Sequence, residues 1–160
     1  MADPNAVICL GEALIDRLGP LGGDPACDQP VDNRLGGAPA NVACGLARLG
    51  TTVAFVGRVG GDAIGADFQH LFSQRGVDTS TLQLDPSHPT RIVLVRRSGD
   101  GERQFQGFAG DQGDGFADQA LQPVALPASA RWLLVGTIPL ASPQSGQALL
   151  DAVAQARSQG

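Results

Sequence analysis

The sequence predicts an α/β fold in which helices cover a parallel sheet. Three apolar runs, at 6–11, 52–57 and 131–136, are continuous rather than alternating, which is typical of parallel strands buried on both faces. After the first and second runs come stretches near 42–49 and 64–72 whose apolar residues recur at helical spacing. Strands that alternate with helices in this way indicate a parallel sheet with helices on its faces.

The amino-terminal segment is predicted to contain three extended pieces. The run at 6–11 is the first buried strand, and 13–17 is an alternating strand in which Ile15 faces away from Asp16. The stretch from 19 to 30 is rich in Gly, Pro and Asp and is expected to be a loop. The residues at 29–35 then form a second short extended piece.

A turn and a helix are predicted next. Gly36 and Gly37 can take backbone angles that a Cβ would forbid, and Pro39 suits a first helical turn because its missing N–H would be unpaired there. Free N–H groups and a partial positive charge gather at a helix start, so a polar ligand could approach the main chain here. The helix is expected to turn its apolar side chains inward and to stop at a glycine: Val42, Leu46, Leu49 and Gly50.

The next strand and helix have clear ends. The strand at 52–57 is expected to be followed by a turn at 57–62, and the helix to end near Gly76. Its apolar face is predicted to consist of Ile64, Phe68, Leu71 and Phe72. The turn superficially resembles a dinucleotide loop, but its glycine spacing is not G-x-G-x-x-G, and no Walker-type phosphate loop occurs in the sequence.

The middle of the chain changes character. Stretches at 81–84, 90–97 and 102–108 are predicted strands, and the glycines and Asp100 within 98–101 predict a hairpin between the last two. Asp111, Asp114 and Asp118 do not have the spacing of a calcium-binding EF-hand loop, so they are expected to lie in a solvated loop.

The last two elements repeat the strand–helix order. The run at 131–136 is predicted to be a third buried strand, and 143–157 an amphipathic helix. The inner face of that helix is expected to contain Leu149, Leu150 and Val153.

Composition excludes several classes of protein. The 160 residues carry a net charge of −5, which argues against a nucleic-acid footprint or an anionic-membrane binder. No apolar run approaches the roughly 18 residues that a membrane span needs. Cys9, Cys27 and Cys44 are widely spaced, and the first and last of them are expected to be small buried residues in a reducing compartment. A cytoplasmic protein is the expectation.

Several motifs occur in an order that resembles a known family. The set Gly36, Gly37, Pro39, Asn41, Ala43, Gly50 and Gly60 resembles the first signature of the ribokinase-like (PfkB) carbohydrate kinases. The stretch 11–16 looks like the opening strand of the fructokinase branch, and 57–65 and 74–78 also match the family. The resemblance extends over the whole chain, which is expected to be the amino-terminal half of such a kinase.

The resemblance implies a fold and an activity. It implies a doubly wound parallel sheet, partial in this chain, with a small β-sheet lid formed by about 13–17, 31–35 and 90–108. In the family this lid closes over the sugar and often supplies a dimer contact. The implied activity is ATP- and Mg²⁺-dependent phosphorylation of a carbohydrate, with fructose as the leading candidate.

The resemblance also implies sugar-binding residues. Asp16 is expected to accept hydrogen bonds from two vicinal hydroxyls, beside Gly36, Gly37 and Asn41; the alternative is a solvated aspartate at a strand end. Arg103 and Phe105 project from one face of their strand and resemble residues of the lid that lean over the sugar. The alternative for this pair is an exposed arginine beside a packing phenylalanine.

The family's catalytic signature is not found in the sequence. The base, the anion hole and the ATP pocket belong to a carboxyl-terminal Asp-x-x-Gly-Ala-Gly-Asp-type stretch, so no catalytic or metal residue is assigned and the chain alone is expected to be inactive. Two alternatives stay open. The chain could be a non-catalytic sugar-binding or subunit-association module, with 132–135 as an open apolar edge, or one piece of a split or truncated kinase.

Overall fold

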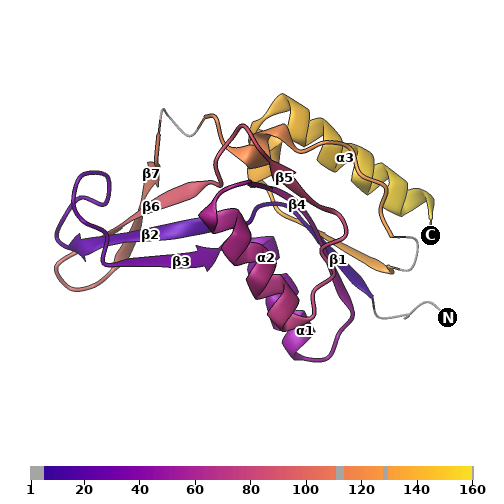
Figure 1. Cartoon of the computed structure of the whole chain (residues 1–160), viewed down its shortest axis with the longest axis horizontal. Helices are drawn as coiled ribbons and strands as arrows, with labels where there is room; N and C mark the ends of the chain where they lie inside the picture. The colour runs from indigo at the N-terminus through magenta and orange to yellow at the C-terminus, as the bar shows by residue number, and fades with distance from the viewer. Residues whose placement is uncertain (1–5, 111–113, 128–129, 160) are drawn as a thin grey trace.

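The chain folds into two sheets, seen side by side in Figure 1. The computed structural model describes residues 6–110, 114–127 and 130–159. The first sheet is parallel and has the order β5-β4-β1-β8; its strands are β1 (Val7–Leu10), β4 (Val53–Gly60), β5 (Leu82–Asp85) and β8 (Trp132–Val135). The second sheet has the order β3-β2-β6-β7; its strands are β2 (Leu14–Leu21), β3 (Asp32–Gly36), β6 (Ile92–Arg97) and β7 (Arg103–Phe108).

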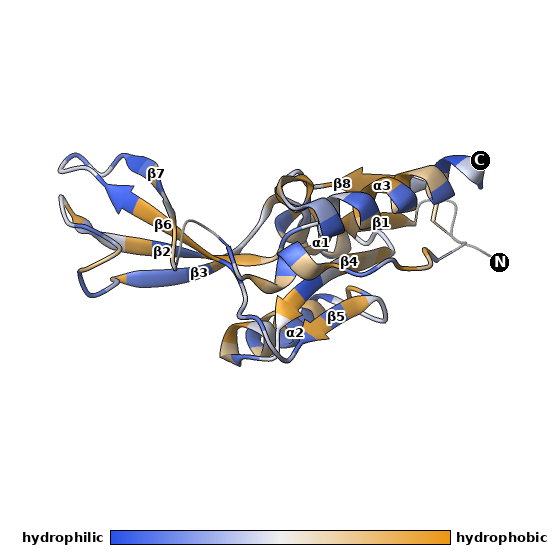
Figure 2. Cartoon of the chain, turned by 90° about the horizontal axis from the view of Figure 1, so that it is seen from above, coloured by the Kyte–Doolittle hydropathy of each residue, from blue (hydrophilic) through white to orange (hydrophobic). Residues whose placement is uncertain are grey.

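Alternate residues of the central strands face two separate cores. Cys9 of β1 and Phe55 of β4 are paired in register and pack under α1 (Ala38–Arg48) and α2 (Ala63–Arg75). Leu10 and Val56 form the next pair and pack on the opposite face with α3 (Pro143–Ser158). Because both faces are covered, the strands are apolar throughout, as the sequence predicts. Figure 2 shows this apolar character along β1 and β4.

Local signals fix the two ends of α2. The side chain of Asp62 accepts a hydrogen bond from the backbone N–H of Gly65 at 2.8 Å, which satisfies one of the free donors at the helix start. At the other end Gly76 takes the left-handed conformation, with φ 73°, which costs a glycine little. The predicted end of this helix at Gly76 is therefore confirmed.

Several details of the helices and strands differ from the sequence prediction. Leu49 and Leu150 are exposed, with 83% and 55% of their surface accessible. Leu49 follows the last residue of α1, and in α3 the inward positions are taken by Leu149 together with Ala148 and Ala152. The strand β4 continues through Gly57 to Gly60, because its second half pairs with β5; the predicted turn at 57–62 begins three residues later.

The second sheet confirms the predicted small β sheet. β2 pairs with β3 in antiparallel and with β6 in parallel orientation, and β6 pairs with β7 as the predicted hairpin. The hairpin turn closes with Gly101 at φ 91°. β2 is longer than expected and takes in residues of the predicted loop up to Leu21, where it pairs with Arg97.

A buried ion pair holds the base of the second sheet. Arg91, just before β6, donates from Nε to Oδ2 of Asp118 at 2.6 Å and from a terminal nitrogen to Oδ1 at 2.9 Å. Asp118 belongs to the short 3₁₀ helix η1 (Ala117–Ala120). The guanidinium also lies 4.6 Å and 4.8 Å from the ring centroids of Phe108 and Phe116. Asp118 is only 3% exposed, so the predicted solvated loop is wrong at this residue, and Asp111 lies outside the described residues.

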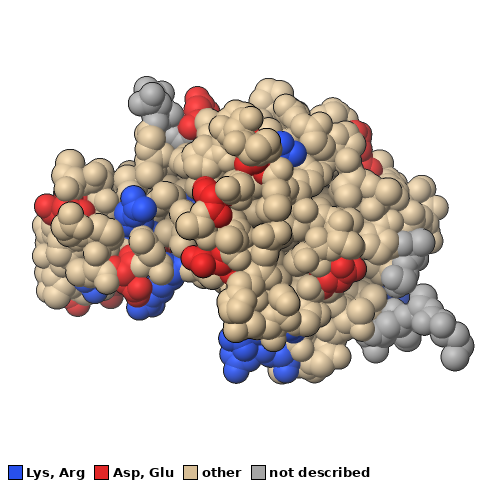
Figure 3. Space-filling view, viewed as in Figure 1, with Lys and Arg blue, Asp and Glu red and all other residues tan. Residues whose placement is uncertain are grey.

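The surface carries charges of both signs. On the face shown in Figure 3, acidic side chains are interspersed with arginines, which lie in small groups rather than one extended patch. Within the described ranges, none of the helices is both long and apolar enough to cross a membrane.

Candidate functional site

The candidate site lies where the second sheet meets the start of α1. Asp16 lies on β2, two register positions from the pair formed by Leu14 and Gly36. A Cβ built on Gly36 would be 2.8 Å from Oδ2 of Asp16. The carboxylate therefore lies directly against the main chain at Gly36, and any side chain at that position would displace it.

The next two predicted residues start the helix. Gly37 is the residue before α1 and has φ 101° and ψ 128°, angles that favour glycine. A Cβ there would be 2.5 Å from the carbonyl oxygen of Glu12. Asn41 donates its backbone N–H to the oxygen of Gly37 at 2.9 Å, and its side chain is exposed. The structure thus brings Asp16, the two glycines and Asn41 to one place in the fold.

Arg103 and Phe105 are on the same face of the second sheet as Asp16. Leu18, Val95 and Phe105 form one cross-strand row, and residues two apart along a strand share a face. Phe105 is 66% exposed, and its ring meets that of Phe108 edge to face at 5.3 Å. The aromatic ring is therefore free to cover a ligand on that face of the sheet.

Burial and Arg103 act in opposite directions on Asp16. Partial burial raises the pKa of the Asp16 carboxyl, and the positive charge of Arg103 lowers it. A negative charge, a positive charge and an exposed ring thus occupy one face, which suits a neutral ligand rich in hydroxyl groups.

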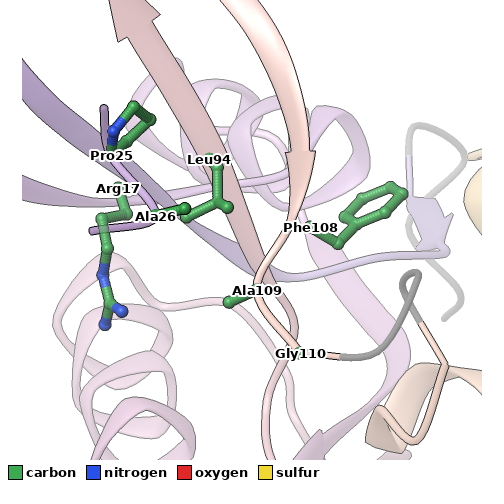
Figure 4. A pocket seen from close by; sticks show the side chains of 7 residues that line it. All are labelled: Arg17, Pro25, Ala26, Leu94, Phe108, Ala109 and Gly110. Atoms are coloured by element: carbon green, nitrogen blue, oxygen red, sulfur yellow. The ribbon is translucent and has the colours of Figure 1, made fainter. Parts of the chain in front are cut away.

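A small concavity lies beside the second sheet, between β2, β6 and the end of β7. It has a volume of about 180 Å³ and lies beside Gly110, with Arg17 on one side and Phe108 on the other (Figure 4). Arg17 pairs in register with Leu94, which also lines the pocket, whereas Asp16 faces the other way. Ligand pockets usually have about 300–1,000 Å³, so this concavity is smaller than an ordinary ligand pocket.

Sequence reasoning missed one buried acid beside the site. Glu12 follows β1 and is 4% exposed, and its Oε2 atom finds no hydrogen-bond partner among the described residues. Burial raises the pKa of the Glu12 carboxyl. The available signal was an acidic residue between two apolar stretches, because a charge in such a place is rarely left without a function.

Metal ligands are not gathered anywhere in the described ranges. No group of three or more His, Cys, Asp or Glu side chains in that part of the chain is placed to hold an ion. The candidate site is therefore described by its hydrogen-bonding groups alone.

Comparison with known proteins gives a consistent result. Residues 5–160 match the family described as "pfkB family carbohydrate kinase". The fructokinase of Salmonella typhimurium is 36% identical over 151 residues, which is 94% of this chain and 47% of that protein. The chain thus spans about half the length of the curated relatives it matches.

Solved structures agree with this. The crystal structure of apo fructokinase from Vibrio cholerae O395 has a TM-score of 0.79 and 35% identity, covering 98% of this chain and 51% of that one. The same enzyme with fructose, ADP and calcium ion bound has a TM-score of 0.74, with 31% identity and coverage of 98% and 48%.

Fructokinase from Xylella fastidiosa with bound ATP has a TM-score of 0.82 and 28% identity, covering 98% of this chain and 50% of that chain. The two-sheet architecture and the sequence match both extend over almost the whole chain. The chain therefore belongs to the pfkB family of carbohydrate kinases.

Proposed function

We propose that this chain is the sugar-binding, amino-terminal part of an ATP-dependent carbohydrate kinase, and that fructose is its substrate. The observation that carries the proposal is the position of the Asp16 carboxylate against Gly36, on a face shared with Arg103 and Phe105. Similarity to a fructokinase solved with bound fructose supports the choice of sugar.

Each residue of the site has a chemical task in this proposal. Asp16 accepts hydrogen bonds from two adjacent hydroxyls, which are stronger than bonds between neutral groups. The bare main chain at Gly36 and Gly37 lets the sugar approach the first turn of α1, where Asn41 offers a donor and an acceptor. Phe105 covers the apolar face of the sugar ring, and Arg103 fixes a further oxygen. The second sheet serves as the lid of the site.

The transfer of phosphate needs groups that we assign to the rest of the kinase. A base for the sugar hydroxyl, donors for the transferring phosphoryl group and usually Mg²⁺ are required. Within this chain no residue is assigned to any of these tasks, and ATP when bound would supply the phosphoryl group. The residues described above bind and orient the sugar and shield it from water.

Sugar binding by the purified chain tests the proposal. We expect fructose to bind, and Asp16→Asn to weaken binding at least about tenfold, because a hydrogen bond to a charged group contributes about 1.5–3 kcal/mol. Asp151→Asn, on the exposed side of α3, is the matched control and should leave binding unchanged. Isothermal titration calorimetry measures both. When ATP and Mg²⁺ are added to the same preparation, no fructose phosphate should form. If Asp16→Asn binds fructose as tightly as the wild-type chain, the proposed site is contradicted.

A second function, association through β8, is favoured by a specific surface. β8 is the end strand of the parallel sheet as described, and Trp132 and Val135 are 65% and 40% exposed. Beside them is a groove of about 350 Å³ between β8 and α3, lined by Arg131, Leu133, Val135, Val153, Ala156 and Arg157. An unpaired apolar edge is a template for another strand, which suits a subunit-association module or a split kinase.

Hydrodynamic measurements test the association. We expect the chain to associate as its concentration rises, and Val135→Lys to reduce the association, because a charge on an edge strand opposes pairing. Leu150→Lys is the control, since Leu150 is similarly exposed but lies outside the groove. Sedimentation velocity over a range of concentrations distinguishes the two variants. A chain that stays monomeric throughout excludes self-association at β8.

A homodimer formed through the second sheet, the lid, predicts a different result. In that case Phe105→Lys, on the exposed face of β7, should reduce the association, and Val135→Lys should not.

A further inference from the structure

Three glycines pack closely at the junction where Glu12 lies. A Cβ on Gly11 would be 2.7 Å from Cγ of Pro39 and 3.1 Å from Cα of Gly136. A Cβ on Gly136 would overlap the carboxyl atom Oε2 of Glu12, and a Cβ on Gly37 would meet the main-chain carbonyl oxygen of Glu12. The end of β1, the start of α1 and the turn after β8 therefore converge on this one residue.

The carboxyl group serves two helical segments that lack caps of their own. Neither α1 nor η2 (Ile138–Ala141) has a side-chain cap or an acidic residue in its first turn. The backbone N–H groups of Ala38 and Ile138, the first residue of each segment, face the Glu12 carboxyl and lower its pKa. In both segments the next residue is a proline, which has no N–H to offer. Glu12, two residues after the end of β1, thus presents an acceptor to both starts.

The surroundings of this group are otherwise nearly free of charge. Burial is the largest effect on the Glu12 carboxyl and raises its pKa, and the Asp118 carboxylate of η1 raises it further, while the N–H groups lower it. Asp118 is itself paired with Arg91. The first turns of α1 and η2 add no acid. A buried carboxyl whose neighbours are main-chain N–H groups, its own among them, is suited to fix geometry.

We propose that Glu12 is a positioning residue, which ties the start of α1 to the turn after β8 and so holds the sugar site in place. Gly36, Gly37 and Asn41 surround the α1 start that Glu12 fixes, while Asp16 approaches Gly36 from β2. The inference deepens the proposed sugar binding and rests on it. Glu12 is too buried to touch the sugar, so it acts through the main chain of α1.

Amide NMR of the complete chain, recorded without sugar, tests whether Glu12 links the start of α1 to the turn after β8. The amide signals of Ala38 and Ile138 should shift together on titration, with one midpoint above the ordinary glutamate pKa of about 4.3. Glu12→Gln should abolish this shared titration and leave the fold intact. Asp16→Asn, which removes the other acid near α1, should leave it unchanged. Amides that titrate independently of Glu12 would overturn the proposal.

Fructose binding supplies the second measurement. Glu12→Ala should weaken binding about tenfold, the scale of a lost helix cap, whereas Glu12→Gln keeps one carbonyl oxygen and should restore most of the affinity. Unchanged binding by Glu12→Ala would overturn the positioning role. If Glu12→Ala does not fold, the Glu12→Gln variant and the amide titration still test the positioning role of Glu12. If the wild-type chain shows the shared titration but does not bind fructose, the proposed function is refuted, whereas the link that Glu12 makes between α1 and the turn after β8 is supported.

Discussion

Replacing Arg91 with alanine is expected to lower the free energy of unfolding by about 3–5 kcal/mol, the usual cost of breaking a buried ion pair from one side. Arg91 and Asp118 are 4% and 3% exposed and are joined by two hydrogen bonds. The substitution leaves the Asp118 carboxylate buried without its partner and removes the cation between two phenylalanine rings. Urea unfolding followed by circular dichroism measures the loss.

Two further variants make this result specific. Arg91→Met combined with Asp118→Leu removes both charges at similar volume and should recover much of the stability, because no unpaired charge remains. Arg103→Ala removes an exposed arginine on the same sheet and should change stability by no more than about 0.5 kcal/mol. If the double variant is as unstable as the single one, packing rather than charge holds the base of the second sheet.

Replacing Gly37 with alanine is expected to cost at least about 3 kcal/mol, as the sum of backbone strain and overpacking. At φ 101° and ψ 128° a side chain is strained, and its Cβ would be 2.5 Å from the carbonyl oxygen of Glu12. That oxygen belongs to a buried main chain that cannot yield easily. Fructose binding should be lost with the turn.

Gly50 provides the matched control for that substitution. It also has a positive φ, 86°, but a Cβ there would meet no atom within 4 Å. Gly50→Ala should therefore cost only about 1–2 kcal/mol, which is the strain alone. Thermal unfolding of both variants gives the comparison, and equal costs would show that the approach to Glu12 is looser than described.

Elements with short-range signals could be predicted from the sequence. The helix α2 has its own cap at Asp62 and its own stop at Gly76, and the β6–β7 hairpin has its turn glycine at 101. Each of these depends on residues a few positions apart. The runs at 6–11 and 52–57 predicted β1 and β4, which are covered on both faces. The prediction of a third buried strand at 131–136 is wrong in its burial, because Trp132 and Val135 of the end strand β8 are 65% and 40% exposed.

Features that depend on distant residues could not be predicted. Asp118 lies in a polar stretch, and the buried arginine that pairs with it, Arg91, is 27 positions away. The extension of β4 to Gly60 depends on the pairing with β5. The exposure of Leu49 and Leu150 depends on where α1 ends and on how α3 is rotated against the sheet, which helical spacing alone does not encode.

Some residues of the candidate site could be predicted from the sequence and others could not. The closeness of Asp16 to Gly36 follows from the register of β2 and β3, and the resemblance to carbohydrate kinases pointed to both residues. Glu12 stayed unnoticed, because the groups of Ala38 and Ile138 that face its carboxyl are main-chain N–H groups, and main-chain groups leave no trace in a residue pattern.

The route of the chain limits how the second sheet can move. The chain leaves the parallel sheet twice, once for β2 and β3 and once for β6 and β7, and returns after each excursion. Glu12, Gly37 and Arg91 anchor these crossings in buried or closely packed surroundings. Peeling from one edge is therefore opposed, because β3 and β7 are both followed by anchored segments.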